Sequence, residues 1–309
     1  MTQALEKCYL GSVVAIGGGH GLANLLNAIK SLTCSLTAVV TVADDGGSSG
    51  RLRRELGAVP PGDLRMCLAA LAPEDSVLGD VMTYRFLQGE LNGHALGNLI
   101  LTALAETLGG MDDACVAAGE MLGIAGKVLP CANEPLELHA ETVSGDVVGQ
   151  VAVHDASGIK RIWVEPADVR VPDAVIAAVA NADFVILGPG SLYTSVLAAA
   201  IAPPLRAAIT NSKAKKVLVC NLREQRNETQ GMSISDQIAA VVQHIGEIDC
   251  VLLDDRFCEP GVLEPEFIGN TTVKVAALSS DDGRSHDANL LVEALLELCD
   301  SRSVFTGGK

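Results

Sequence analysis

Short apolar runs alternate along this chain with segments of helical periodicity, and this pattern most constrains its fold. The runs are rich in Val, Leu, Ile and Ala, as in parallel strands buried between helices. Strand alternating with helix predicts an α/β fold whose mostly parallel sheet carries helices on both faces. The predicted strands are residues 12–16, 36–42, 183–187, 216–220, 250–254 and 272–278, and the clearest helices are residues 22–31, 173–181, 192–201, 235–245 and 288–299.

Two regions break the alternation. Residues 60–125 are mainly helical, with the "PPGD" of residues 60–63 as a helix start. Residues 127–165 alternate apolar and polar side chains around Ser-Gly turns, which predicts a small antiparallel β excursion from the main sheet. Neither repeats nor linkers divide the chain, so we expect one domain over residues 10–300, followed by a flexible tail at 301–309.

Composition limits the partners. The formal net charge is -16, and such a surface repels nucleic acid and anionic lipid. The first apolar run is too short to span a bilayer and no signal peptide precedes it. The nine cysteines have no CxxC spacing, which favours reduced thiols. We expect a cytoplasmic protein that binds neither nucleic acid nor membrane but accepts a small phosphorylated ligand.

The first glycine loop lies in "VVAIGGGHGLANLL", residues 13–26. Gly17 and Gly19 open a dinucleotide fingerprint, but Leu22 occupies its third glycine position, and the Lys of a P-loop is absent. We therefore expect no NAD. Glycines between a strand and a helix still let backbone amides bind a phosphate, although a tight turn is the alternative. The predicted phosphate-binding residues are Gly18, Gly19, His20 and Gly21.

A second loop, "VADDGGSSGRLRRELG" at residues 42–57, follows the second strand. Asp44 and Asp45 stand where open α/β sheets bind ligands, and paired acids suit a Mg²⁺ ion or the hydroxyls of a sugar. Small residues followed by arginines suit a diphosphate. Alternatively, the acids cap a helix and Arg51 pairs with Glu55. Ser48, Ser49 and Arg51 are predicted to bind phosphate, and Asp44 and Asp45 are the candidate Mg²⁺ ligands.

Two helical motifs offer further polar side chains. Asp63 is predicted to cap a helix whose first turn holds Arg65, where a cation opposes the helix dipole and so favours a ligand-facing role. His94 and Asn98, four residues apart in "GHALGNLIL", are expected on one helix face. Such a pair presents an imidazole and an amide to a ligand or has a structural role.

A third strand-loop-helix unit, "FVILGPGSLYTSVL", spans residues 184–197. Ser191 lacks the Gly-x-Ser-x-Gly spacing of a nucleophile elbow, so we interpret it as a helix cap or a phosphate donor. Another strand ends at Asn221. Because parallel strands end at the same edge of a sheet, these loops predict one nucleotide or nucleotide-sugar pocket that includes Gly188, Gly190, Ser191 and Asn221.

The blocks "AIGGGHGLANLLNAIK", "VADDGGSSGRLRRELGAVPPGDLRMCLAALA", "GHALGNLILTAL", "ILGPGSLYTSVL" and "HDANLLVEAL" resemble, in the same order, the gluconeogenesis factor (YvcK-type) group of the CofD-like family. The resemblance implies a three-layer α/β/α, Rossmann-like fold and a nucleotide-sugar ligand such as UDP-N-acetylglucosamine. It also implies a role in cell shape and carbon metabolism. The sister branch, 2-phospho-L-lactate transferase, moves phospholactate from a lactyl-diphosphonucleoside to a deazaflavin alcohol, using Mg²⁺.

The resemblance also implies roles for single residues. Gly18, Gly19, Asn98, Gly190 and Ser191 would hold the nucleotide diphosphate, whereas Asp45, Arg85, His94 and Arg284 would lie on the acceptor or sugar side. Three departures concern the predicted mouth: His20 replaces the usual Thr, "NLREQRNET" replaces "NLMTQPGET", and Arg284 does not directly precede His-Asp.

Two functions remain open on these residues: a binder of a nucleotide sugar, and a transferase in which Asp44 or Asp45 holds Mg²⁺ or accepts a proton. A deazaflavin would stack on aromatic side chains, and the loops offer mainly Tyr84, Phe86 and Tyr193. That scarcity favours the binder. An Ala/Leu-rich helical surface predicts a homodimer.

Overall fold

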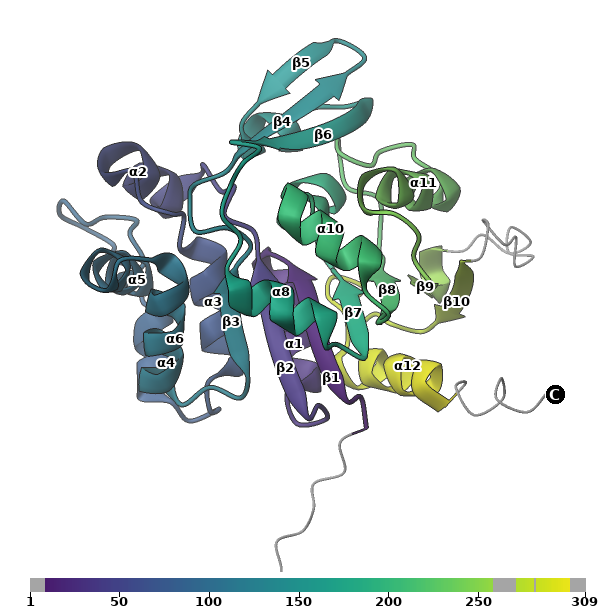
Figure 1. The fold of residues 1–309 in the computed structure, drawn as a ribbon, viewed down its shortest axis with the longest axis horizontal. Coiled ribbons are helices and arrows are strands. Elements are labelled where there is room, and N and C mark those ends of the chain that lie inside the picture. Colours follow the sequence, from purple (N-terminus) through teal and green to yellow (C-terminus); the bar gives the residue numbers. More distant parts are fainter. Residues whose placement is uncertain (1–8, 258–270, 281, 301–309) are drawn as a thin grey trace, which may run out of the picture.

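The computed structural model describes residues 9–257, 271–280 and 282–300 (Figure 1). Its centre is a seven-stranded sheet in the order β10-β9-β8-β7-β1-β2-β3, and all neighbouring strands are parallel. The six predicted strands are confirmed within a few residues, and β3 adds a seventh at one edge. The strands are β1 (Ser12–Gly17), β2 (Ser35–Val40), β3 (Lys127–Pro130), β7 (Phe184–Leu187), β8 (Lys215–Val219), β9 (Cys250–Asp254) and β10 (Thr272–Ala276).

Helices cover both faces of this sheet, which confirms the three-layer fold. In Figure 1, α8 (Asp173–Ala180) and α10 (Pro203–Asn211) lie in front of the central strands, and α1 (Gly19–Ile29) lies behind them. Helix α1 packs against α3 (Gly62–Leu71) and α12 (Ala288–Asp300). Buried strands of Val, Ile and Leu between two helical layers form one continuous apolar core.

Residues 192–201 are helical as predicted, but most of them do not form an α-helix. Residues Leu192–Leu197 form a π-helix, which continues into the short helix α9 (Ala198–Ala200). Helix α11 (Ile234–Ile245) begins with a capping box between Ser233 and Asp236. A short 3₁₀ turn, Asp255–Phe257, follows β9.

The region of residues 60–125 is helical as predicted. It contains α3, α4 (Val77–Thr83), α5 (Leu96–Leu108) and α6 (Met111–Leu122), and α2 (Gly47–Leu56) precedes it.

The predicted cap at Asp63 and the predicted helical position of His94 are wrong. Asp63 is not the cap of α3, because the helix already begins at Gly62 and its cap position is Pro61. His94 precedes α5 because its carbonyl accepts a hydrogen bond from Phe86 N–H in a two-stranded bridge.

The β excursion is confirmed as a three-stranded antiparallel sheet, shown at the top of Figure 1. It consists of β4 (Glu137–Thr142), β5 (Gly145–Val148) and β6 (Ile159–Glu165). Its predicted extent needs two corrections. Residues Lys127–Pro130 pair with β2 and belong to the main sheet, and Gln150–His154 form helix α7 between β5 and β6. His244 of α11 accepts a hydrogen bond from Ile162 N–H (2.9 Å) and so joins this sheet to the helical layer.

Two compositional expectations bear on the described part of the chain. Five cysteines there are free and buried: Cys67, Cys115, Cys131, Cys220 and Cys250. Cys34 is disulfide-bonded, so the expectation of reduced thiols is wrong at this position. Cysteine spacing in the sequence does not show which thiols lie close together in the fold.

In the described ranges no single helix has both the length and the apolar composition to cross a membrane. One pair bent by 82°, Leu192–Ala200 with Pro203–Asn211, meets these criteria only when taken together. The predicted tail at residues 301–309 lies outside the described residues.

Candidate functional site

A polar pocket of about 460 Å³ lies at the carboxyl ends of β1, β7 and β8. The loops after these strands meet there with a fourth segment that precedes α12. The predicted convergence at one sheet edge is therefore present for these loops, whereas no residue of the second loop, 42–57, lines the pocket. The lining residues are Gly18, Gly19, His20, Gly21 and Asn24 after β1; Pro189, Gly190, Ser191 and Ser195 after β7; Asn221, Leu222, Arg223 and Gln225 after β8; and Arg284, Ser285 and His286.

The loop after β1 exposes backbone to this pocket. Helix α1 begins at Gly19, and its cap residue, Gly18, has no side chain with which to bond the first N–H groups of the helix. A Cβ at Gly21 would clash with the carbonyl oxygen of Pro189, so glycine lets the first and third loops touch. The helix start therefore presents amides and the positive end of the helix dipole to the pocket.

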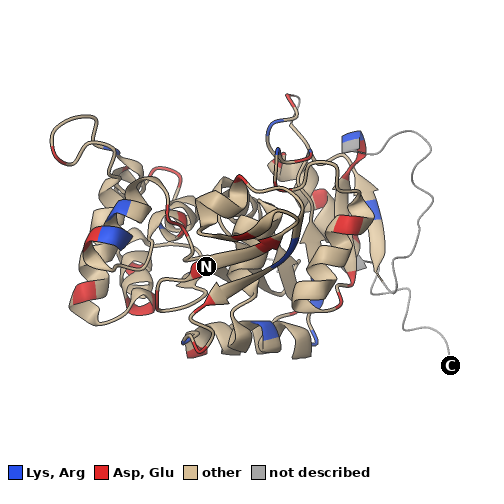
Figure 2. Ribbon diagram, turned by 90° about the horizontal axis from the view of Figure 1, so that it is seen from above, with Lys and Arg blue, Asp and Glu red and all other residues tan. Residues whose placement is uncertain are grey.

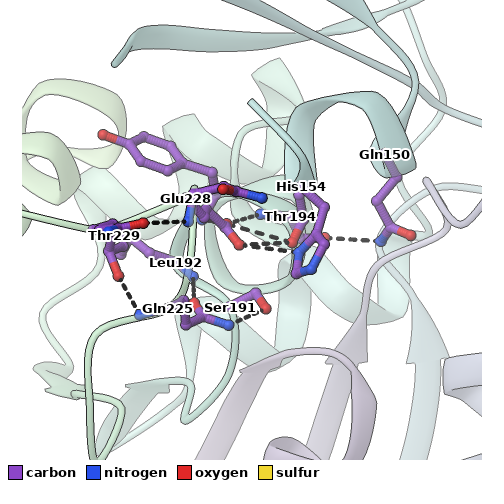
Figure 3. A network of polar contacts seen from close by, with 11 residues as sticks. Gln150, His154, Ser191, Leu192, Thr194, Gln225, Glu228 and Thr229 are labelled. Atoms are coloured by element: carbon purple, nitrogen blue, oxygen red, sulfur yellow. Dashed lines mark hydrogen bonds and ion pairs between the residues drawn. The ribbon is translucent and has the colours of Figure 1, made fainter. Parts of the chain in front are cut away.

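The loop after β7 is arranged differently. The N–H groups of Tyr193 and Thr194 donate to the Glu228 carboxylate at 2.6 and 2.8 Å. Gln225 donates to the Ser191 hydroxyl at 2.6 Å and accepts from Leu192 N–H at 3.4 Å (Figure 3). The first turn of the π-helix is thus bonded to side chains of the loop after β8.

Two carboxyl groups lie behind the first glycine loop. Asp63 lies against Gly18, where a Cβ would clash with the Asp63 carboxylate. Burial raises the pKa of Asp63 to about 7, and the nearby charge of Asp44 adds to the rise, whereas the N–H of Gly19 favours ionisation. Burial also raises the pKa of Asp44, which accepts from Gly46 N–H at 3.0 Å.

The third acid of this region, Asp45, has another partner. Its Oδ1 accepts a hydrogen bond from Val151 N–H (3.1 Å) at the N-terminus of α7. Asp44 therefore has two acidic neighbours: its charge raises the pKa of Asp63, and the charge of Asp45 raises the pKa of Asp44. Sequence reasoning missed Asp63 as a site residue because no spacing relates it to Asp44; the fold alone brings them together.

These two acids bear on the Mg²⁺ that the sequence comparison implies. Across the described residues there is no group of three or more His, Cys, Asp or Glu arranged to hold a metal. Two neighbouring carboxylates fit Mg²⁺ nevertheless, since this ion commonly takes one or two protein carboxylates and completes its shell with water and substrate phosphates. Asp44 and Asp63 are the residues that would hold it.

A buried polar network lies between α2, α3 and α5. Asn98 Nδ2 donates to Ser48 Oγ (3.0 Å), and Ser48 Oγ shares a second hydrogen bond with His94 Nδ1 (3.0 Å). Arg65 Nε donates to Asn98 Oδ1 (3.1 Å). Burial and then the charge of Arg51 lower the pKa of His94, which favours neutral imidazole. His94 and Asn98 are thus brought together through Ser48 and not along one helix face.

The predicted site residues divide into two groups. Gly18, Gly19, His20, Gly21, Gly190, Ser191, Asn221 and Arg284 line the pocket, whereas Asp44, Asp45, Ser48, Ser49, Arg51, Arg85, His94, Asn98 and Gly188 do not. Arg51 and Arg85 donate to the backbone carbonyls of Asn92 and Gly93. The lining also includes residues that the sequence did not single out, namely Asn24, Ser195, Arg223, Gln225 and His286.

Relatives of known sequence agree with this architecture. Gluconeogenesis factors from Halalkalibacterium halodurans and Bacillus subtilis are 37% and 41% identical, over 93% and 79% of this chain and 96% and 78% of their own lengths. A relative from Nostoc sp. is 43% identical over 82% of this chain, which spans 57% of that longer protein.

A solved structure is similar as well. The crystal structure of a UPF0052 family member from Bacillus halodurans matches with a TM-score of 0.86 and 35% identity, over 95% of this chain and 100% of that one. The family model described as 2-phospho-L-lactate transferase CofD matches residues 13–290. The chain therefore belongs to the CofD family, in its gluconeogenesis factor group.

Proposed function

We propose that this protein binds a nucleotide sugar of the UDP-N-acetylglucosamine type and acts through it in the control of carbon metabolism and of the cell envelope. The observation that carries the proposal is the start of α1 beside a 460 Å³ pocket, where the cap residue Gly18 has no side chain and Gly18, Gly19, His20 and Gly21 line the pocket. A diphosphate at this point would accept hydrogen bonds from backbone N–H groups and interact with the helix dipole.

Charge in the pocket supports an anionic ligand despite the net charge of -16. Arg223 and Arg284 are among the lining residues, and the Asp282 carboxylate lies 3.9 Å from Arg284 Nε. Asp and Glu are distributed over both helical layers (Figure 2). A cationic pocket within an acidic exterior favours small phosphorylated ligands over polyanions.

Two glycine substitutions test the proposal. Gly19 and Gly57 have almost the same backbone angle, φ +66 and +67, and a Cβ would meet nothing within 4 Å at either. Gly19→Ala and Gly57→Ala should therefore cost similar stability, about 1 kcal/mol each. Only Gly19→Ala should weaken binding of UDP-N-acetylglucosamine, by tenfold or more, in calorimetric titrations. Equal affinities for the two variants would refute the proposed diphosphate position.

The titration panel also separates ligand classes. UDP-N-acetylglucosamine, UDP, GDP, NADH and inorganic phosphate are compared with and without Mg²⁺. We expect UDP-N-acetylglucosamine to bind most tightly and NADH weakly, since the glycine fingerprint is incomplete. If UDP-N-acetylglucosamine binds no better than phosphate, the nucleotide-sugar function fails.

A transferase of the 2-phospho-L-lactate type is the second candidate, and the Asp44–Asp63 pair favours it. Without a bound metal, a pKa of about 7 allows Asp63 to accept a proton from an attacking hydroxyl near neutral pH; as a Mg²⁺ ligand it would instead stay ionised. Bound Mg²⁺ would neutralise diphosphate charge there. Product from a lactyl-diphosphonucleoside and a deazaflavin alcohol, lost in Asp63→Asn, would establish this activity.

The homodimer and the cytoplasmic location stay predictions. Light scattering after gel filtration tests the first, and cell fractionation tests the second. A monomer at micromolar concentration would refute the dimer.

A further inference from the structure

Glu228 is a buried carboxylate outside the pocket lining. Its side chain has no exposed surface, and burial raises its pKa. It lies in the loop after β8, yet its Oε1 accepts from the N–H groups of Tyr193 and Thr194, in the first turn of the π-helix after β7. The Thr194 hydroxyl lies 3.3 Å from its second oxygen.

This position is the one that a bound anion occupies at a helix N-terminus. The first N–H groups of a helix have no partner within the helix, and their partial positive charge favours an anion. Here the protein supplies the anion itself. The two helix starts therefore differ in extent: at the start of α1 the carboxyl group of Asp63 bonds the N–H of Gly19, whereas at the start of the π-helix Glu228 bonds the N–H groups of both Tyr193 and Thr194.

The same loop contributes the pocket wall. Thr229, next to Glu228, accepts from Gln225 N–H through its hydroxyl at 2.9 Å. Gln225 in turn donates to Ser191 Oγ (2.6 Å), and both residues line the pocket. Figure 3 shows this succession of contacts from Glu228 through Thr229 and Gln225 to Ser191. Ser191 is thus connected by hydrogen bonds to the loop that holds Glu228, a carboxylate outside the pocket lining.

Helix α7, which lies between β5 and β6, contacts both Glu228 and the π-helix. His154 Nδ1 lies 3.5 Å from the second oxygen of Glu228, and Gln150 donates to the carbonyl of Thr194 at 2.9 Å. Contacts from two separate segments, the loop after β8 and α7, therefore meet at the first turn of the π-helix.

We propose that Glu228 is a positioning residue of the ligand pocket. It acts as an internal anion that locks the loop of residues 221–231 onto the π-helix and so fixes the Ser191 wall of the pocket. The ligand consequence rests on the proposed nucleotide-sugar function; the locking of the loop does not.

Proteolysis tests the lock without a ligand. Arg223 and Arg226 are exposed in the loop. In Glu228→Gln the side chain keeps its size and one oxygen that can accept from both N–H groups. It loses the negative charge that strengthens these bonds, and an NH₂ donor replaces the second carboxylate oxygen, which lies beside Thr194 and His154. We expect trypsin to cleave after Arg223 and Arg226 at least tenfold faster than in the wild type, as followed by mass spectrometry.

Ligand titration tests the positioning role. The dissociation constant for UDP-N-acetylglucosamine should rise about tenfold in Glu228→Gln. Asp236→Asn is the matched control, because Asp236 belongs to the capping box at the start of α11 and lies outside the pocket lining. It should lower the melting temperature without changing the affinity or cleavage after Arg223 and Arg226.

A milder variant covers the case in which Glu228→Gln does not fold. Thr194→Val removes only the hydroxyl beside Glu228 and should move cleavage and affinity in the same direction by a smaller factor. Wild-type cleavage rates and affinity in all folded variants would overturn the inference. If the wild type itself binds no UDP-N-acetylglucosamine, the proposed function fails, while the cleavage rates still decide whether Glu228 locks the loop.

Discussion

At the scale of single residues, the acids of the second loop have different environments although they are adjacent in sequence. Asp44 lies with Asp63 behind the first glycine loop, whereas Asp45 bonds the start of α7. Burial without a neutralising cation raises the pKa of a carboxyl group, and a second carboxyl group raises it further. Asp63 therefore combines a buried position with a proton that is exchangeable near neutral pH.

The shifted pKa of Asp63 makes stability depend on pH. Its pKa is about 7 in the folded protein and about 3.9 when unfolded. Between these values the folded state binds more protons, so its contribution to stability is lost as pH rises from about 4 to about 7, by at most roughly 4 kcal/mol. Asp63→Asn should remove this slope, measured as the wild-type minus variant unfolding free energy in urea across pH 4 to 8. Parallel curves for the two proteins would contradict the assignment.

Asp45 should behave as a helix-capping residue. Asp45→Ala removes the acceptor of Val151 N–H and should cost about 1 kcal/mol of unfolding free energy. Asp45→Asn keeps a side-chain oxygen and should retain most of that stability. Denaturant midpoints check both variants. An alanine variant as stable as the wild type would mean that Asp45 does not stabilise α7.

At the scale of elements, the glycine loops position one another. A Cβ on Gly21 would meet backbone atoms of Pro189, which cannot move aside as a flexible side chain can. Gly21→Ala should therefore separate the loops, cost about 1–3 kcal/mol and weaken ligand binding. Gly79→Ala in α4 is the control: its Cβ would lie at least 3.4 Å from its neighbours, so the change should be neutral or stabilising. Similar melting temperatures for Gly21→Ala and Gly79→Ala would show that Gly21 does not lie in close contact with the backbone of Pro189.

The same scale explains what sequence could predict. Continuous apolar runs identified six strands of the main sheet because strands buried on both faces leave few polar positions. The four residues of β3 were assigned to the β excursion since nothing local distinguishes an edge strand of the main sheet from a neighbouring antiparallel one. The π-helix was unpredictable for a related reason: its first N–H groups bond to Glu228, which lies far along the chain. Loop convergence followed from parallel topology, whereas the pairing of Asp44 with Asp63 required the folded chain.

At the scale of the whole molecule, the exterior is strongly acidic while the ligand proposed for the pocket is an anion. Long-range repulsion from a net charge of -16 should slow the approach of a diphosphate. Contacts inside the pocket are short and are screened less than this long-range field. The acidic exterior should therefore change the association rate constant of the ligand more than its dissociation rate constant.

Ionic strength separates the two effects. Raising salt from about 20 to about 200 mM shortens the screening distance from roughly 20 Å to below 10 Å. The association rate constant of UDP-N-acetylglucosamine, measured by stopped flow, should rise, because screening removes the repulsion. Binding of the uncharged analogue uridine, the control, should not change. A steep fall in the rate with salt would mean that local arginines such as Arg223 and Arg284 govern the approach, as in proteins that attract polyanions, and that the acidic exterior has no part in selecting the ligand.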